Sequence, residues 1–183
     1  MKVAMTGGTG FIGAHLIRAL LDAGHDVRAV VRNPDRARQL EAWGVELAVA
    51  ELSDREALQV ALNGCQQLYH MAACATVWER QSETYFNVNA HGTDNVLRAA
   101  KAAGVERVVV TSSGGVIGPS VSGVVSEEKP RDLNYFNAYE ASKAASDLVV
   151  LRHVLGEGLH AVLVSPTRGV GPYLGGGAAS GVL

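Results

Sequence analysis

Tyr139 and Lys143 are the residues whose spacing is best suited to acid–base chemistry. They lie four positions apart in a segment with helical periodicity, so their side chains share one helix face and can meet. A free tyrosine titrates near pKa ~10, and a nearby ammonium favours the phenolate and lowers that pKa. Ser113 follows a β-branched run, and its hydroxyl is suited to hold a carbonyl or alcohol oxygen beside Tyr139. We expect a catalytic Ser-Tyr-Lys site, although an isolated Tyr–Lys pair at this spacing is more often an ordinary helix surface pair.

A glycine-rich turn, Thr6–Gly13, follows an apolar run at residues 3–5 and precedes a helical segment. Gly7 allows a sharp turn out of the strand, Gly10 a close approach to a phosphate, and Gly13 close packing of helix and strand. The N–H groups at the start of the helix then face the ligand. The order strand, turn, helix predicts a dinucleotide site rather than a glycine turn without a ligand. Further cofactor contacts are expected in the same stretch, at Thr9, Phe11 and Ile12.

Composition narrows the class of protein. The 183 residues fit one domain with a buried core, and 48% apolar and 19% charged residues are ordinary globular values. A net charge of −2 gives no electrostatic case for nucleic acid or an anionic membrane. Cys65 and Cys74 lie nine residues apart and belong to no Cys/His cluster, which argues against a metal site and favours a reducing compartment. With no signal-peptide pattern and no long apolar run, a cytoplasmic protein is expected, and the Ser-Tyr-Lys chemistry points to a small-molecule substrate.

Short β-rich runs alternate with helical periods along the chain. Continuous apolar strands between helices predict an α/β fold, a doubly wound parallel sheet of the Rossmann type with helices on both faces. The expected strands are Lys2–Met5, Asp26–Val31, Val45–Ala50, Gln67–Met71, Arg107–Thr111 and His160–Val164. The expected helices are Phe11–Ala23, Asp35–Ala42, one capped by Ser53 or Asp54 that ends near Leu62, Glu83–Ala102, and Ala138–Leu155 stopped by Gly156 and Gly158.

The end of the chain differs in composition from the rest. Residues 173–183 contain three consecutive glycines and mostly small side chains. We therefore assign residues 1–172 to a dinucleotide-binding domain. Residues 173–183 are expected to be a Gly-rich tail, the start of a substrate subdomain that is absent from this sequence.

Five motifs in order resemble the extended short-chain dehydrogenase/reductase family, of the dihydroflavonol-reductase and nucleotide-sugar-epimerase type. They are Thr6–Gly13, His70-Met71-Ala72-Ala73, Asn89-Ala90-His91-Gly92-Thr93, Thr111-Ser112-Ser113 and Tyr139-Glu140-Ala141-Ser142-Lys143. The resemblance implies an NAD(P)-dependent oxidoreductase in which Tyr139 is the acid or base. It also implies that Lys143 binds the nicotinamide ribose and that Ser113 polarises the substrate.

The resemblance implies further roles outside the glycine turn. Cofactor contacts are implied beside the adenine, after the fourth strand and after the last strand, at Glu51, Leu52, Ala72, Ala73 and Pro166. Asn89 matches an asparagine that steadies the active-site backbone, with a mid-helix polar residue facing a loop as the alternative, and His70 is expected to pack near the cofactor rather than titrate in catalysis. Relatives often dimerise through the two helices expected at Glu83–Ala102 and Ala138–Leu155, so a homodimer is implied.

The end of the second strand indicates which nicotinamide cofactor binds. A carboxylate there would hold the ribose hydroxyls of NAD, whereas an arginine accommodates the 2′-phosphate of NADP. The family's acidic position falls on Val31, and Arg32 follows it. Because guanidinium and phosphate form a strong pair, NADP is favoured, with NAD as the alternative and a merely solvated Arg32 as the interpretation without a ligand. Arg36 is placed to assist, and Arg28 lies further away.

Two functions from different classes remain open. The set Ser113, Tyr139 and Lys143 favours an NADP-dependent reductase or dehydrogenase acting on a ketone or secondary alcohol, with a nucleotide-sugar epimerase or dehydratase as the other enzymatic alternative. The missing subdomain favours a truncated or non-catalytic NADP-binding module. Arg32 and the Thr111–Gly115 segment lean toward carbonyl reduction of the dihydroflavonol-reductase type.

Overall fold

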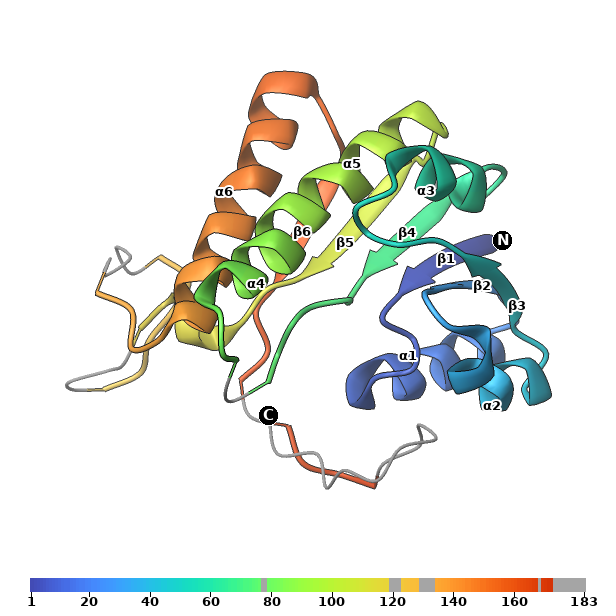
Figure 1. Cartoon of the computed structure of the whole chain (residues 1–183), viewed down its shortest axis with the longest axis horizontal. Coiled ribbons are helices and arrows are strands. Elements are labelled where there is room, and N and C mark those ends of the chain that lie inside the picture. The colour runs from blue at the N-terminus through green and yellow to red at the C-terminus, as the bar shows by residue number, and fades with distance from the viewer. Residues whose placement is uncertain (77–78, 119–122, 129–133, 168, 173–183) are drawn as a thin grey trace.

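Six parallel strands form the centre of the molecule, which a computed structural model describes for residues 1–76, 79–118, 123–128, 134–167 and 169–172 (Figure 1). The strands are β1 (Lys2–Thr6), β2 (Asp26–Val31), β3 (Glu46–Val49), β4 (Gln67–His70), β5 (Arg107–Thr111) and β6 (Ala161–Val164). Their order is β3-β2-β1-β4-β5-β6, and every neighbouring pair is parallel. This is the strand order of the doubly wound dinucleotide-binding fold, so the predicted fold class is confirmed.

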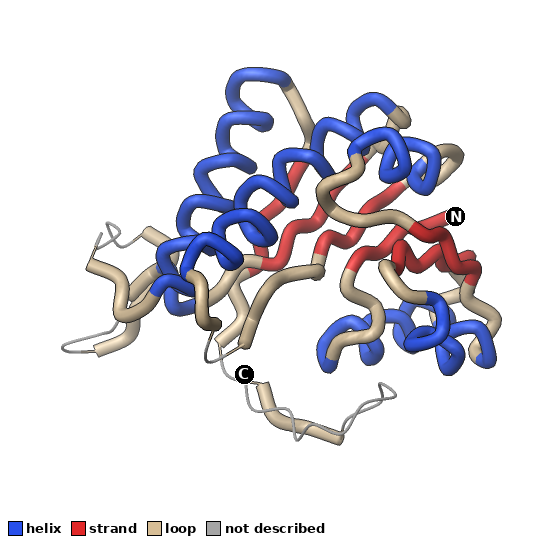
Figure 2. The backbone as a smooth tube through the Cα atoms, viewed as in Figure 1, coloured by secondary structure: helices blue, strands red, loops and turns tan. Residues whose placement is uncertain are grey.

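Helices cover both faces of the sheet (Figure 2). Successive side chains of a strand point to opposite faces, so each face has its own apolar core beneath its helices. In β1, Val3 packs with Ile17 in one core, whereas Ala4 packs with Leu97 in the other. The first core lies under α1 (Phe11–Asp22) and α2 (Arg38–Ala42), and the second under α3 (Arg55–Leu62), α5 (Gly92–Ala102) and α6 (Ala138–Glu157). The carboxyl ends of all six strands therefore meet at one edge, from which the loops with the candidate site residues leave.

Several helix boundaries differ from the sequence prediction for local reasons. The Asp54 side chain accepts the N–H of the third residue of α3 at 3.0 Å, so Asp54 rather than Ser53 is the N-cap. Gly156 lies inside α6, and the helix instead ends at Gly158, whose φ of 68° is left-handed. The segment after β2 begins with a 3₁₀ turn, Pro34–Ala37, before α2.

The segment predicted as one helix over Glu83–Ala102 contains a π-helical turn. It consists of α4 (Ser82–Phe86), the π turn Asn87–His91 and α5. A π turn holds an extra residue relative to the α-helical ladder, and such turns are frequent at functional sites. Here it carries the buried Asn89, which is 1% exposed, toward the loop after β4.

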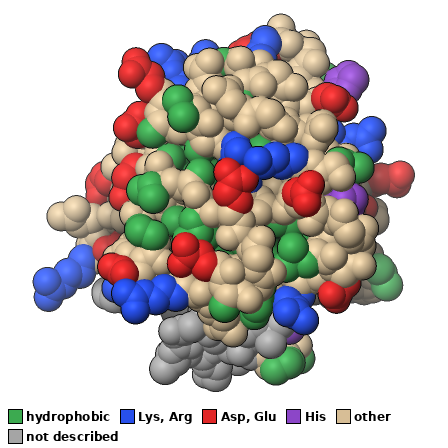
Figure 3. Space-filling view, turned by 90° about the vertical axis from the view of Figure 1, so that its right-hand side faces the viewer, with side chains coloured by type: hydrophobic (Ala, Val, Ile, Leu, Met, Phe, Trp, Pro, Cys, Tyr) green, Lys and Arg blue, Asp and Glu red, His purple; other side chains and the backbone are tan. Residues whose placement is uncertain are grey.

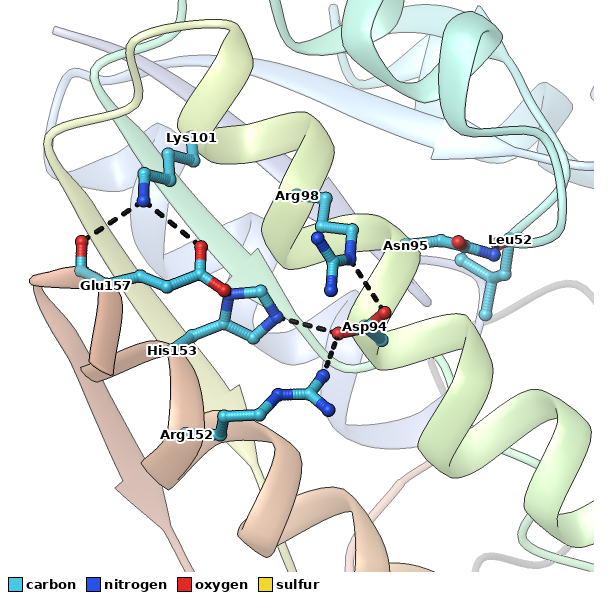
Figure 4. A network of polar contacts seen from close by, with 8 residues as sticks. All are labelled: Leu52, Asp94, Asn95, Arg98, Lys101, Arg152, His153 and Glu157. Carbon is cyan, nitrogen blue, oxygen red and sulfur yellow. Dashed lines mark hydrogen bonds and ion pairs between the residues drawn. The ribbon is translucent and has the colours of Figure 1, made fainter. Parts of the chain in front are cut away.

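A network of charged side chains joins α5 to α6 (Figure 4). Asp94 accepts hydrogen bonds from Arg98 at 2.9 Å and from the fully buried His153 at 2.7 Å, and Lys101 reaches Glu157 at 3.1 Å. Burial raises the pKa of the Asp94 carboxyl, but the hydrogen bonds from Arg98 and His153 outweigh it and hold that pKa below its ordinary value. The network fixes α6, which carries two of the predicted catalytic residues, against α5.

The surface is electrostatically mixed. On the face seen in Figure 3, acidic and basic side chains are interspersed rather than gathered by sign. Among the helices of the described residues, none is both long and apolar enough to cross a membrane. The predicted tail at residues 173–183 lies outside the described part of the chain.

Candidate active site

The glycine turn between β1 and α1 has no room for side chains at two positions. Gly7 has a φ of 75°, and a Cβ there would lie 2.5 Å from the backbone nitrogen of Ala72. A Cβ on Gly13 would lie 2.2 Å from the carbonyl oxygen of Gly7, so the close packing expected of Gly13 is against the turn itself. Gly10 is the N-cap of α1 and offers no side-chain cap, and the first turn holds no acidic residue. The positive end of α1 is thus arranged as in helices that bind anions.

Two arginines after β2 are available for a ligand, whereas a third is not. Arg32 and Arg36 are exposed, and the described residues provide Arg32 with neither a hydrogen bond nor an ion pair. Arg28 donates to Glu46 at 2.9 Å and to the carbonyl oxygen of Ala61 at 2.9 Å. The Arg28 guanidinium is therefore occupied by contacts within the protein and is not available for a ligand.

The loop after β3 is held against the start of α5. The carbonyl oxygen of Leu52 accepts a hydrogen bond from the Asn95 side chain at 3.0 Å (Figure 4). A Cβ on Gly92 would lie 3.2 Å from that of Leu52, so this helix position keeps the loop close. Glu51, the preceding residue, is exposed.

A buried chain of hydrogen bonds ties the ends of β1 and β4 to the helix layer. Thr6 Oγ1 lies 2.7 Å from His70 Nδ1, and His70 Nε2 lies 3.0 Å from Thr93 Oγ1. Because Thr93 donates its one hydroxyl proton to the carbonyl oxygen of Asn89, His70 donates from Nε2 and accepts from Thr6. Burial, and then the Lys143 charge, lower the pKa of His70 to about 3. This agrees with the expectation that His70 does not titrate in catalysis, and its packing near the cofactor stays a prediction.

Asn89 clamps the loop that follows β4. Its Oδ1 accepts the N–H of Cys74 at 2.7 Å, and its Nδ2 donates to the Cys74 carbonyl at 3.1 Å and to Ser142 Oγ at 2.9 Å. The fully buried Ser142 extends this hydrogen-bond network, because it donates to the carbonyl oxygen of Tyr139 at 2.7 Å. The structural role expected of Asn89 is confirmed. The part played by Ser142 was not predicted, because a small hydroxyl in a helix carries no sequence signal of its own.

The same loop carries two of the implied cofactor contacts. Ala72 and Ala73 are half-buried, and the N–H of Ala72 donates to Thr6 Oγ1 at 3.2 Å. Ala72 also lies where a side chain on Gly7 would collide. The loop after β4 therefore packs directly against the glycine turn.

Ser113, Tyr139 and Lys143 gather at the carboxyl end of β5. The Ser113 side chain lies near enough to the Tyr139 hydroxyl to lower its pKa, and the Tyr139 ring stands edge-on to Tyr85 with centroids 6.3 Å apart. Lys143 is 4% exposed and donates from Nζ to the carbonyl oxygen of Thr111 at 2.6 Å. The structure thus brings the three side chains to one strand end, but it turns the lysine amine toward the backbone.

The turn after β6 lies beside this group. The carbonyl oxygen of Pro166 accepts the N–H of Gly114, the residue after Ser113, at 2.9 Å. Ser113 itself caps the 3₁₀ turn Gly114–Val116 by accepting the N–H of Gly115 at 3.3 Å. Pro166 therefore borders the same strand end as Ser113.

The electrostatics of the three residues differ from the sequence expectation. Burial raises the pKa of Tyr139 above its ordinary value; the nearby Ser113 side chain opposes this rise, and the Glu140 charge adds to it. Burial lowers the pKa of Lys143 to about 8, although the nearby Asp147 charge favours the ammonium. The expectation that Lys143 lowers the pKa of Tyr139 is wrong for this structure, because the amine faces the Thr111 carbonyl and burial dominates at the phenol.

The lowered pKa of Lys143 predicts that the free energy of unfolding depends on pH. Its folded pKa, about 8, lies below the unfolded value of 10.5, so between these values the unfolded chain binds more protons and stability rises with pH. The slope is at most about 1.4 kcal/mol per pH unit. Lys143→Met lacks this term, so the wild-type free energy of unfolding, minus that of the variant, should increase from pH 8 to 10 in urea titrations.

Lys101→Met, which removes an exposed lysine, is the matched control for this experiment. A difference between wild type and Lys143→Met that stays constant with pH would show that Lys143 is not held with a lowered pKa.

An open parallel sheet in this strand order, with a crowded glycine turn after its first strand, is the Rossmann-type fold of dinucleotide-binding proteins. Comparison with known families makes this assignment more specific. The chain belongs to the NAD-dependent epimerase/dehydratase family, whose sequence profile matches residues 3–183.

Individual relatives agree with the family assignment. The chain is 36% identical over 171 residues to a putative dihydroflavonol 4-reductase from Synechocystis, covering 92% of this chain and 49% of the relative. It is 37% identical over 174 residues to sterol demethylase protein B from Methylococcus capsulatus, covering 94% and 53%. The solved dTDP-glucose 4,6-dehydratase DesIV from Streptomyces venezuelae, with NAD bound, matches with a TM-score of 0.79 at 30% identity, covering 89% and 54%. The chain thus spans about half the length of the curated relatives it matches.

Proposed function

We propose that the chain is the dinucleotide-binding part of an NADP-dependent oxidoreductase that interconverts a ketone and a secondary alcohol. The observation that carries this proposal is the gathering of Ser113, Tyr139 and Lys143 at the carboxyl end of β5, where Lys143 lies one helical turn from Tyr139 and donates to the carbonyl oxygen of Thr111 at 2.6 Å. The similarity to a putative dihydroflavonol 4-reductase supports it. A nicotinamide cofactor supplies or accepts the hydride when it is bound.

The residues around the strand ends fit such a cofactor. The turn has no side chain at Gly7 and Gly13, where a Cβ would collide with the backbone, and the start of α1 suits a diphosphate. Arg32 is exposed and available for a 2′-phosphate. The remaining contacts in the proposal are Thr9, Gly10, Phe11, Ile12, Glu51, Leu52, Ala72, Ala73, Lys143 and Pro166.

Tyr139 acts in this proposal as the general acid for reduction. Its raised pKa keeps the phenol protonated at neutral pH, so it can donate a proton to the oxygen of the ketone. Ser113 hydrogen-bonds the same oxygen and orients it. Lys143, whose amine donates to the Thr111 carbonyl in this structure, binds the ribose in this proposal and, with a pKa of about 8, keeps a positive charge near the site below that pH.

Replacing Arg32 by aspartate is expected to reverse the cofactor preference. A carboxylate repels the 2′-phosphate and accepts hydrogen bonds from ribose hydroxyls, so NADPH should bind about 10–100-fold more weakly and NADH more tightly. Isothermal titration with both cofactors measures this. Arg55→Asp, the same charge change on α3, is the matched control and should leave the ratio of the two affinities unchanged. An unchanged ratio in Arg32→Asp would remove Arg32 from the cofactor site.

A cofactor-binding module with little turnover is the second candidate, and it is favoured by the Lys143 amine, which faces the Thr111 carbonyl while burial raises the pKa of Tyr139. Titration of the 183-residue chain with NADPH, combined with hydride-transfer assays over ketones and lactol sugars, separates the two functions. Tight binding without turnover of any substrate would favour the module. Turnover of lactol sugars but not of ketones would favour an epimerase or dehydratase.

A further inference from the structure

Residues 169–172 and the first two turns of α1 are in contact, although they lie far apart in the sequence. His15 Nε2 lies 2.7 Å from the carbonyl oxygen of Pro172. Because a carbonyl oxygen only accepts hydrogen bonds, His15 is the donor. The half-buried imidazole is also held by Phe11, whose ring stands edge-to-face to it at 5.4 Å and 82°. His15 therefore has one fixed orientation, directed at the backbone of this segment.

The segment also follows the Phe11 ring. A Cβ on Gly171 would lie 3.4 Å from Cζ of Phe11, and one on Gly169 would lie 3.8 Å from Cε1. Val170, between the two glycines, is 81% exposed. Since Phe11 is the first residue of α1, residues 169–172 lie beside the helix end that would bind the diphosphate (Figure 1).

The residues just before this segment border the other end of the candidate site. The Pro166 carbonyl accepts the N–H of Gly114, and a Cβ on Gly114 would lie 3.0 Å from the Thr167 methyl group. The connection after β6 therefore has contacts at the Ser113 loop and again at the start of α1. A dinucleotide extending from the glycine turn to Ser113 would lie along this connection.

We propose that His15 is a positioning residue that anchors residues 169–172 beside the diphosphate end of the cofactor site and so slows cofactor release. The inference rests on the proposed function, because it concerns a bound dinucleotide. His15 donates to the protein backbone, and its contribution is to hold the segment that borders the ligand.

The test compares NADPH release from wild type and His15 variants. His15→Ala is expected to raise the dissociation rate of NADPH about five- to tenfold in stopped-flow fluorescence, with a smaller change in the association rate. His15→Gln keeps an N–H donor and should restore most of the slow release. His160→Ala, at an exposed histidine before β6, is the matched control and should behave as wild type.

Hydrogen exchange in the cofactor-free protein separates anchoring from general destabilisation. The amides of residues 169–171 should exchange faster in His15→Ala than in wild type, while those of α1 stay unchanged. Faster exchange throughout α1 would overturn the proposal, and so would equal NADPH dissociation rates in variants that bind. Failure of the wild-type chain to bind either NADPH or NADH would instead contradict the proposed function itself, and the inference with it.

Discussion

Replacing Tyr139 by phenylalanine is expected to lower the rate of NADPH-dependent ketone reduction by about 10²–10⁴-fold, the usual contribution of a general acid. Phenylalanine keeps the ring and its edge-on contact with Tyr85 but removes the hydroxyl that we propose donates a proton to the substrate oxygen. Cofactor affinity should change by less than about twofold, because the phenol is assigned to substrate rather than to cofactor.

The experiment measures turnover and NADPH affinity side by side. Tyr69→Phe, which removes the hydroxyl of a half-buried tyrosine on β4, is the matched control and should keep wild-type turnover. If Tyr139→Phe reduced ketones as fast as wild type, Tyr139 would not be the acid. If the variant lost NADPH binding in proportion to turnover, the role of Tyr139 would be structural.

Gly13→Ala is expected to lower the free energy of unfolding by about 3 kcal/mol and to abolish cofactor binding. The new Cβ would lie 2.2 Å from the carbonyl oxygen of Gly7 and 2.9 Å from Cα of Gly8. Both atoms belong to the backbone, so the clash cannot be relieved by a side-chain rotation. The turn must move, and with it the N–H groups that face the diphosphate.

Urea unfolding and NADPH titration measure the two consequences of Gly13→Ala. Gly156→Ala is the matched control, since it makes the same change inside α6, where among the described residues only its own helix backbone and chain neighbours lie within 4 Å of the new Cβ. This control should be stabilised by up to about 1 kcal/mol through helix propensity. Wild-type stability in Gly13→Ala would contradict the close packing of the turn.

The strand and helix pattern could be predicted from the sequence because each element has a strong local signal. The apolar runs Asp26–Val31 and Arg107–Thr111 have the predicted bounds, and the glycine turn joins β1 to α1 as expected. The π turn Asn87–His91 could not be predicted, because the residues on either side have ordinary helical periodicity. Its presence depends on tertiary contacts of Asn89.

The sequence predicts that Ser113, Tyr139 and Lys143 lie near one another, but it does not predict their pKa values. The four-residue spacing places Tyr139 and Lys143 on one helix face, but it does not determine which way the amine turns. That depends on the Thr111 carbonyl, at the end of a strand far away in the sequence. Burial of the phenol, which raises its pKa, is likewise a property of the assembled fold. The NADP preference, the homodimer and the cytoplasmic location stay predictions, since each concerns a molecule or compartment outside the chain.

The π turn also sets the rotational phase between α4 and α5. Each residue of an α-helix advances the helix by about 100°, so deleting one residue from Asn87–His91 could restore regular α-helix but would rotate α4 by that amount relative to α5. Tyr85 would then lose its contact with Tyr139 and its hydrogen bond to the carbonyl oxygen of Thr76. The contacts of Tyr85 therefore fix the number of residues in this helix to a single value. The helix sequence by itself would tolerate one residue fewer.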